Sequence, residues 1–211
     1  MFSREIARAG LDIGAIKLRP DDPFTWASGF RMPIYNDNRM FLFHPRFRDL
    51  ISDGFLNLLE TKDLDFDVIA GTSTAGISPA TTLADKLNKP FIYVRDAPKD
   101  HGLGNQIEGI DAESDLSGYN IVLVEDLIST GGSSVRAVEA IRNANGRCDY
   151  CVSIFDYGLD KAAQAFEALD PSCEVDSLLV YSNLLEEARD TNYINPAQER
   201  MLADWRDDPF N

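Results

Sequence analysis

The chain has 211 residues, of which 44% are hydrophobic, so it can bury one substantial core within a single domain. Its formal net charge of −15 argues against nucleic acids and anionic membranes as partners, because both require basic surface. The sequence contains neither an apolar run long enough to span a membrane nor a charged-then-apolar leader, so we expect a cytoplasmic protein. A polyanionic substrate would need local positive potential from basic side chains, backbone amides or a metal ion.

The N-terminal part of the sequence predicts a group of short elements. Residues 2–13 place apolar side chains at helical spacing. Residues 15–18 and 24–37 are rich in aromatic and β-branched side chains, which favours short strands. Residues 45–59 predict a helix, with Pro45 in its first turn. We interpret approximately residues 1–40 as a small hood over a larger core.

The rest of the chain alternates strand-like and helix-like segments. Strands are expected at residues 66–70, 91–94, 121–124, 150–155 and 174–181, and helices after the turn at 71–76 and at 135–145, 160–169, 184–189 and 196–205. This alternation predicts an α/β fold with a mainly parallel sheet flanked by helices. We expect one domain over residues 1–211, whose hood and C-terminal helical segment adjoin a core at approximately 41–182.

Residues 121–134, IVLVEDLISTGGSS, are the stretch most informative about function. The apolar run suits a strand buried on both faces, and Glu125 and Asp126 follow it, where open α/β sheets bind ligands. The glycine- and hydroxyl-rich turn at 129–133 can direct backbone N–H groups at a phosphate, assisted by the dipole of the next helix. By composition alone, an ordinary βα turn is an equal alternative.

Two further stretches carry residue types suited to anions. Residues 71–76 repeat the strand, turn and helix order and form a second candidate anion loop, although helix capping alone explains Thr72 equally well. Residues 95–109 hold Arg95, Lys99, His101 and three glycines in an otherwise acidic chain. Such a loop can close over a charged reaction and exclude water, and a plain surface connection is the alternative.

Several other chemistries are excluded by the motifs. Cys148, Cys151 and Cys173 form no disulfide framework, and the C-x-x-C pair lies on a strand where residues three apart should face opposite sides, so we expect structural thiols. GTSTAG has Ala75 where a serine hydrolase needs glycine, and no histidine follows His101. GLGNQIEG fails the dinucleotide fingerprint, and no P-loop sequence is present.

Two adjacent acids followed by a TGGS turn resemble the phosphoribosyl pyrophosphate (PRPP) motif of the type I phosphoribosyltransferases. Residues 24–29 and 33–35 resemble the hood of the orotate phosphoribosyltransferases, residues 95–104 resemble their catalytic loop, and residues 193–209 resemble the tail of some bacterial members. The resemblance implies Mg²⁺-dependent transfer of the 5-phosphoribosyl group from PRPP to orotate, giving orotidine 5′-monophosphate and pyrophosphate in pyrimidine (UMP) biosynthesis. It also implies a homodimer with shared active sites.

The resemblance implies a role for each matching residue. The implied catalytic residues are Lys99, His101 and Asp126. The implied PRPP contacts are Arg95, Lys99, His101, Glu125, Asp126, Leu127, Ile128, Ser129, Thr130, Gly131, Gly132, Ser133, Gly71 and Thr72. The acid pair would hold the ribose hydroxyls, residues 130–133 the 5′-phosphate, and the three basic residues the pyrophosphate. The implied orotate contacts are Ser129, Tyr157, Tyr35 and Arg39, and Mg²⁺ would be held mainly by substrate oxygens rather than by protein ligands.

Three positions depart from the family pattern. Asp96 follows Arg95 where many members have a lysine, and Ala75 replaces another lysine in the 71–76 loop. Tyr157 falls where an arginine often binds the carboxylate of orotate. A related bacterial subgroup resembles this chain in these changes, so we interpret them as subgroup differences.

The departures leave the recognition of orotate open, with Arg31, Arg39 and Tyr35 as candidate replacements for the missing arginine. Two other functions remain as alternatives. One is a phosphoribosyltransferase for another base, such as a purine, and the other is a non-enzymatic PRPP-sensing regulator on the same fold. A DNA-binding regulator should carry a basic domain, and the sequence has none.

Overall fold

The computed structural model describes residues 2–25, 31–97, 106–111 and 113–209. The helices are α1 (Phe2–Asp12), the 3-10 helix η1 (Asn38–Phe43), α2 (Pro45–Thr61), α3 (Ile77–Leu87), α4 (Gly132–Asn143), α5 (Asp160–Glu167), α6 (Tyr181–Asp190) and α7 (Pro196–Asp207). The strands are β1 (Ile16–Leu18), β2 (Phe24–Thr25), β3 (Arg31–Met32), β4 (Ile34–Asn36), β5 (Val68–Thr72), β6 (Phe91–Val94), β7 (Ile107–Glu108), β8 (Asn120–Ile128), β9 (Arg147–Asp156) and β10 (Glu174–Val180).

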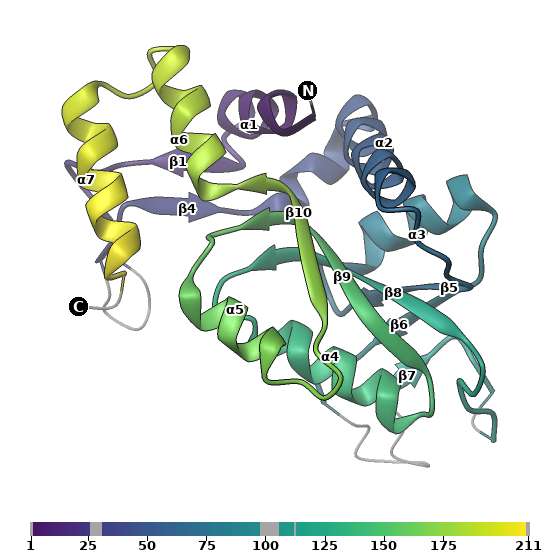
Figure 1. Cartoon of the computed structure of the whole chain (residues 1–211). Coiled ribbons are helices and arrows are strands. Elements are labelled where there is room, and N and C mark those ends of the chain that lie inside the picture. The colour runs from purple at the N-terminus through teal and green to yellow at the C-terminus, as the bar shows by residue number, and fades with distance from the viewer. Residues whose placement is uncertain (1, 26–30, 98–105, 112, 210–211) are drawn as a thin grey trace.

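A six-stranded sheet in the order β10-β9-β8-β5-β6-β7 forms the centre of the molecule (Figure 1). Every pair in it is parallel except β6 and β7, which are antiparallel. α3 connects β5 to β6, α4 connects β8 to β9, and α5 connects β9 to β10, as is usual for parallel neighbours. The predicted α/β class with a mainly parallel sheet is therefore confirmed.

The sheet is buried on both faces because its central strands are continuously apolar. Val122 and Val124 of β8 pack into a core with α2 and α3, whereas Ile121 and Leu123 pack into a second core with α4 and α5. Figure 1 shows α4 and α5 on one side of the sheet and α2 and α3 on the other. Alternate residues of one apolar run therefore serve two cores.

The N-terminal and C-terminal segments meet beyond the carboxyl ends of the parallel strands. There α1, the antiparallel β1–β4 pair, α6 and α7 lie together (Figure 1). α1 packs against both α6 and β10, so the two ends of the sequence support the same part of the molecule. No helix within the described ranges is long and apolar enough to cross a membrane.

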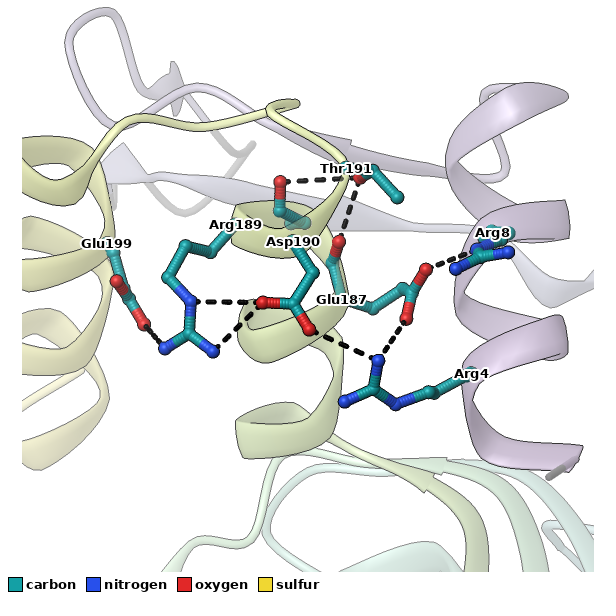
Figure 2. A network of polar contacts seen from close by, with 8 residues as sticks. Arg4, Arg8, Glu187, Arg189, Asp190, Thr191 and Glu199 are labelled. Carbon is teal, nitrogen blue, oxygen red and sulfur yellow. Dashed lines mark hydrogen bonds and ion pairs between the residues drawn. The ribbon is translucent and has the colours of Figure 1, made fainter.

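A charged network joins α1 to α6 (Figure 2). Glu187 of α6 has a fully buried side chain and forms ion pairs with Arg8 and, at 3.5 Å, with Arg4 of α1. On the other side of α6, Arg189 lies 3.1 Å from Glu199 of α7. Because a buried carboxylate needs compensating charge, this network fixes α1 and α7 against α6.

The structure differs from the sequence-based expectations in three details. β8 continues to Ile128, so the acid pair lies within a strand rather than after it. β7 gives the segment between residues 95 and 109 a strand that was not predicted. Cys148 and Cys151 pack in the same core because a register shift beside Asn120 inserts an extra residue into β9; the prediction of opposite faces was wrong, although all three cysteines are buried and free.

Candidate functional site

Glu125 is the buried centre of the site, with 4% of its surface exposed. Thr72 Oγ1 donates to Glu125 Oε1 at 2.6 Å, and Ser134 Oγ donates to Oε2 at 3.0 Å. The backbone N–H of Asp126 also donates to Oε1, at 3.0 Å. These bonds compensate the desolvated carboxylate and tie the end of β5 and the first turn of α4 to β8.

Asp126 is the more accessible carboxyl of the pair. Burial, followed by the adjacent charge of Glu125, raises the pKa of Asp126 to about 7, while the positive charge of Arg39 acts in the opposite direction. The backbone oxygen of Asp126 accepts a 2.6 Å hydrogen bond from Asn38 Nδ2 at the start of η1. The hood segment is therefore attached to the same residue that presents a carboxyl to the site.

The turn after β8 has the backbone geometry of an anion loop. Gly131 adopts φ +78°, a left-handed conformation that favours glycine, and a Cβ there would meet Ala162 and Phe166 of α5. α4 begins at Gly132 without a hydrogen-bonded side-chain cap from a described residue, so N–H groups of its first turn remain available to a phosphate.

The 71–76 loop folds back against β8. A Cβ on Gly71 would lie 2.9 Å from the backbone oxygen of Gly76, and a Cβ on Gly76 would lie 2.7 Å from the backbone oxygen of Val124. α3 then begins at Ile77. Its N-cap residue is Gly76, so no side chain at that position caps the helix. This loop and the 129–133 loop thus follow the carboxyl ends of two neighbouring parallel strands, β5 and β8.

The predicted lid begins and ends on a paired stem. The backbone N–H of Arg95 donates to the carbonyl of Gln106 at 2.9 Å, and the guanidinium of Arg95 lies 3.5 Å from Glu108. Asp96 forms a 2.6 Å ion pair with Arg136 of α4. The departure from the family pattern at position 96 therefore adds a contact between this stem and the helix of the phosphate loop.

The other predicted PRPP-binding residues differ in how exposed they are. Lys99 and His101 lie outside the described residues. Ser129 and Thr130 are partly exposed in the phosphate loop, and Ser133 is exposed. Leu127 and Ile128 contribute side chains to the two cores, which leaves their backbone groups for a ligand.

The candidate orotate residues Arg39 and Tyr157 lie in different surroundings. Arg39 lines a crevice that Asp126 also lines. Tyr157 is 4% exposed and packs against Phe155, Tyr181 and Trp205, and burial raises the pKa of Tyr157.

Sequence reasoning overlooked three polar residues that support the acid pair. These are Ser134 beside Glu125, Asn38 beside Asp126, and Asp37, which holds Arg39. The hydroxyl-rich turn offered a local signal for the serine. Asn38 gave no such signal, because its bond to Asp126 depends on how the hood packs on the sheet, whereas Asp37 lies only two residues from its partner Arg39.

Together, the acid pair and the two candidate anion loops at the carboxyl ends of parallel strands form the arrangement expected of an α/β protein that binds sugar phosphates. Residues 38–183 match the family model for the phosphoribosyl transferase domain. The orotate phosphoribosyltransferase of Streptococcus agalactiae is 44% identical over 210 residues, which cover 100% of this chain and 98% of that protein. The chain therefore belongs to the orotate phosphoribosyltransferases of the type I phosphoribosyltransferase family.

Solved structures give the same result for the fold. The UMP synthase of Leishmania donovani superposes with a TM-score of 0.77 and 28% identity, covering 97% of this chain but 42% of that protein. The orotate phosphoribosyltransferase of Mycobacterium tuberculosis in complex with PRPP superposes with a TM-score of 0.65 and 25% identity, covering 87% of this chain and 99% of that one. The predicted family and its type I fold are confirmed.

Proposed function

We propose that this protein is an enzyme that transfers the 5-phosphoribosyl group of PRPP to orotate, giving orotidine 5′-monophosphate and pyrophosphate in pyrimidine biosynthesis. The full-length identity of 44% to an orotate phosphoribosyltransferase carries the proposal. The arrangement of the acid pair between two anion loops supports it physically, because PRPP combines a ribose with phosphates on both sides.

The acid pair has two distinct tasks in this proposal. Glu125 already accepts from four described donors, Thr72 Oγ1, Ser133 Oγ, Ser134 Oγ and the Asp126 N–H, so it ties β8 to β5 and α4 and supplies negative charge. Asp126 offers the more accessible oxygens and contacts the ribose hydroxyls. Displacement at the anomeric carbon builds positive charge on the sugar, which preorganised carboxylates stabilise electrostatically.

The two anion loops account for the phosphates. Thr130, Gly131, Gly132 and Ser133 hold the 5′-phosphate at the N-terminus of α4. The 71–76 loop and Arg95 lie on the pyrophosphate side, where Lys99 and His101 complete the positive charge from the lid.

We also propose Mg²⁺ as the cofactor, held mainly by oxygens of PRPP. Asp126 supplies the hard oxygen ligand type that this ion prefers, so the residues present fit it. The described residues contain no group of three or more histidine, cysteine or acidic side chains arranged to hold a metal. When bound, the ion would neutralise charge on the pyrophosphate.

A homodimer with shared active sites is the assembly we propose. The 3-10 helix η1 exposes Met40, Leu42 and Phe43, the last with 87% of its surface accessible, and such an apolar group favours burial against a second copy. Light scattering should give twice the chain mass, and Phe43→Glu should lower it. A monomeric wild-type protein would refute this assembly.

The cytoplasm is the compartment we propose, since the three buried cysteines are free thiols, as a reducing environment favours.

The test of the reaction is a spectrophotometric assay of orotate consumption with PRPP and Mg²⁺, run beside hypoxanthine, xanthine and uracil. We expect turnover of orotate. Turnover of a purine without orotate would favour the alternative base, and PRPP binding without turnover of any base would favour a PRPP-sensing regulator.

A further inference from the structure

The carboxylate of orotate requires a cation, and the position where the family often has an arginine holds Tyr157, which is enclosed by aromatic rings. Resting on the proposed function, we infer that Arg39 binds this carboxylate and that Asp37 is the positioning residue that orients Arg39. The pair would thereby determine specificity for a carboxylated pyrimidine over uracil.

The location of Arg39 follows from its neighbours. Asn38 Nδ2 donates to the backbone oxygen of Asp126 at 2.6 Å, which brings the start of η1 to the acid pair. Arg39 and Asp126 line one crevice, together with Ser78 of α3. A base attacking the ribose must lie near Asp126, so Arg39 is within the region that the base occupies.

The orientation of Arg39 follows from Asp37. Arg39 Nε donates to Asp37 Oδ1 at 2.7 Å and Arg39 Nη2 donates to Asp37 Oδ2 at 2.9 Å. Hydrogen bonds from Arg39 and, less strongly, from Tyr35 lower the pKa of Asp37, so this carboxylate is charged at neutral pH. It occupies the Nε side of the guanidinium. No other described residue is hydrogen-bonded to the guanidinium of Arg39, so its Nη1–Nη2 edge suits a second, bidentate carboxylate.

The exposure of Arg39 suits a ligand contact. Its side chain is 65% exposed, although Asp37 holds it in place. Other described arginines around the site have different partners: Arg95 pairs with Glu108, Arg136 pairs with Asp96, and Arg48 donates to the backbone oxygen of Leu42. Arg39 therefore combines proximity to Asp126 with a guanidinium edge directed by a fixed neighbour.

The experiment compares Arg39→Gln, Arg39→Lys and Arg46→Gln with the wild-type enzyme, using orotate and uracil as acceptors. Arg46 is the matched control, because it is an exposed arginine in the first turn of α2 that does not line the crevice. We expect Arg39→Gln to raise the KM for orotate roughly 10- to 100-fold while the KM for PRPP stays within about twofold. Arg39→Lys should recover part of this loss, since it keeps the charge but not the fork.

The preference for orotate over uracil should fall in Arg39→Gln, because uracil lacks the carboxylate. Asp37→Asn should change the KM for orotate in the wild-type background and have no further effect when Arg39 is already glutamine, as expected for a residue that acts through Arg39. An unchanged KM for orotate in Arg39→Gln, or an equal rise in Arg46→Gln, would overturn the inference. A wild-type protein that does not use orotate would instead refute the proposed function.

Discussion

Asp126→Asn tests the electrostatics of the acid pair. In the folded protein, burial and the charge of Glu125 raise the pKa of Asp126 from 3.8 to about 7. The folded state therefore holds this proton more tightly than the unfolded chain, so ionising Asp126 lowers stability as the pH rises from about 4 to 7. Below that window the destabilisation is absent, and above it the destabilisation is complete.

The magnitude follows from the difference between the two pKa values of Asp126. Its upper limit is roughly 4 kcal/mol at about 1.36 kcal/mol per pKa unit. Because Asp126 is partly exposed and solvent screens its interaction with the charge of Glu125, we expect about 1 to 3 kcal/mol. Asp126→Asn removes the ionisation, so at pH 8 the variant should melt roughly 2 to 10 °C above the wild-type protein.

The assay is thermal unfolding of Asp126→Asn, the wild-type protein and Glu60→Gln at pH 5 and pH 8. Glu60 is an exposed residue of α2 and controls for the loss of one negative charge from a chain of net charge −15. The stabilisation should be roughly two to three times larger at pH 8 than at pH 5 and should be absent in the control. Equal stabilisation of Asp126→Asn at both pH values, or destabilisation at pH 8, would refute the reasoning, and the variant should also lose transferase activity.

Three further predictions concern the surroundings of the acid pair, the charged network and the lid. Thr72→Val removes the 2.6 Å donor to buried Glu125 and should lower the free energy of unfolding by about 1–3 kcal/mol, measured by urea denaturation, and weaken PRPP binding; an unchanged midpoint would contradict it. Arg8→Ala should destabilise the protein by up to roughly 3 kcal/mol, because its partner is fully buried, whereas Arg189→Ala, whose partners are more exposed, should cost less than about 1 kcal/mol. Lys99→Ala should slow the transfer step far more than it weakens PRPP binding by calorimetry, and equal losses would argue against a lid role.

Local sequence patterns were sufficient to predict much of the fold. Continuous apolar runs predicted strands buried on both faces, and helical spacing from Pro45 onward predicted α2. Their boundaries were less accurate where neighbouring strands decide the ends. β8 extends to Ile128 because β9 continues to pair with it as far as Asp156.

The sequence by itself determined the local order of the site. The acid pair, the glycine-rich turn and the start of the next helix are adjacent along the chain, so their order could be predicted without the fold. Only the tertiary structure decided what surrounds these two carboxyls. Thr72 reaches Glu125 across 53 residues, and Asn38 reaches Asp126 across 88. Such contacts depend on strand order and on how the hood packs. The raised pKa of Asp126 and the position of Arg39 near the acid pair therefore follow from burial and proximity that no local pattern encodes.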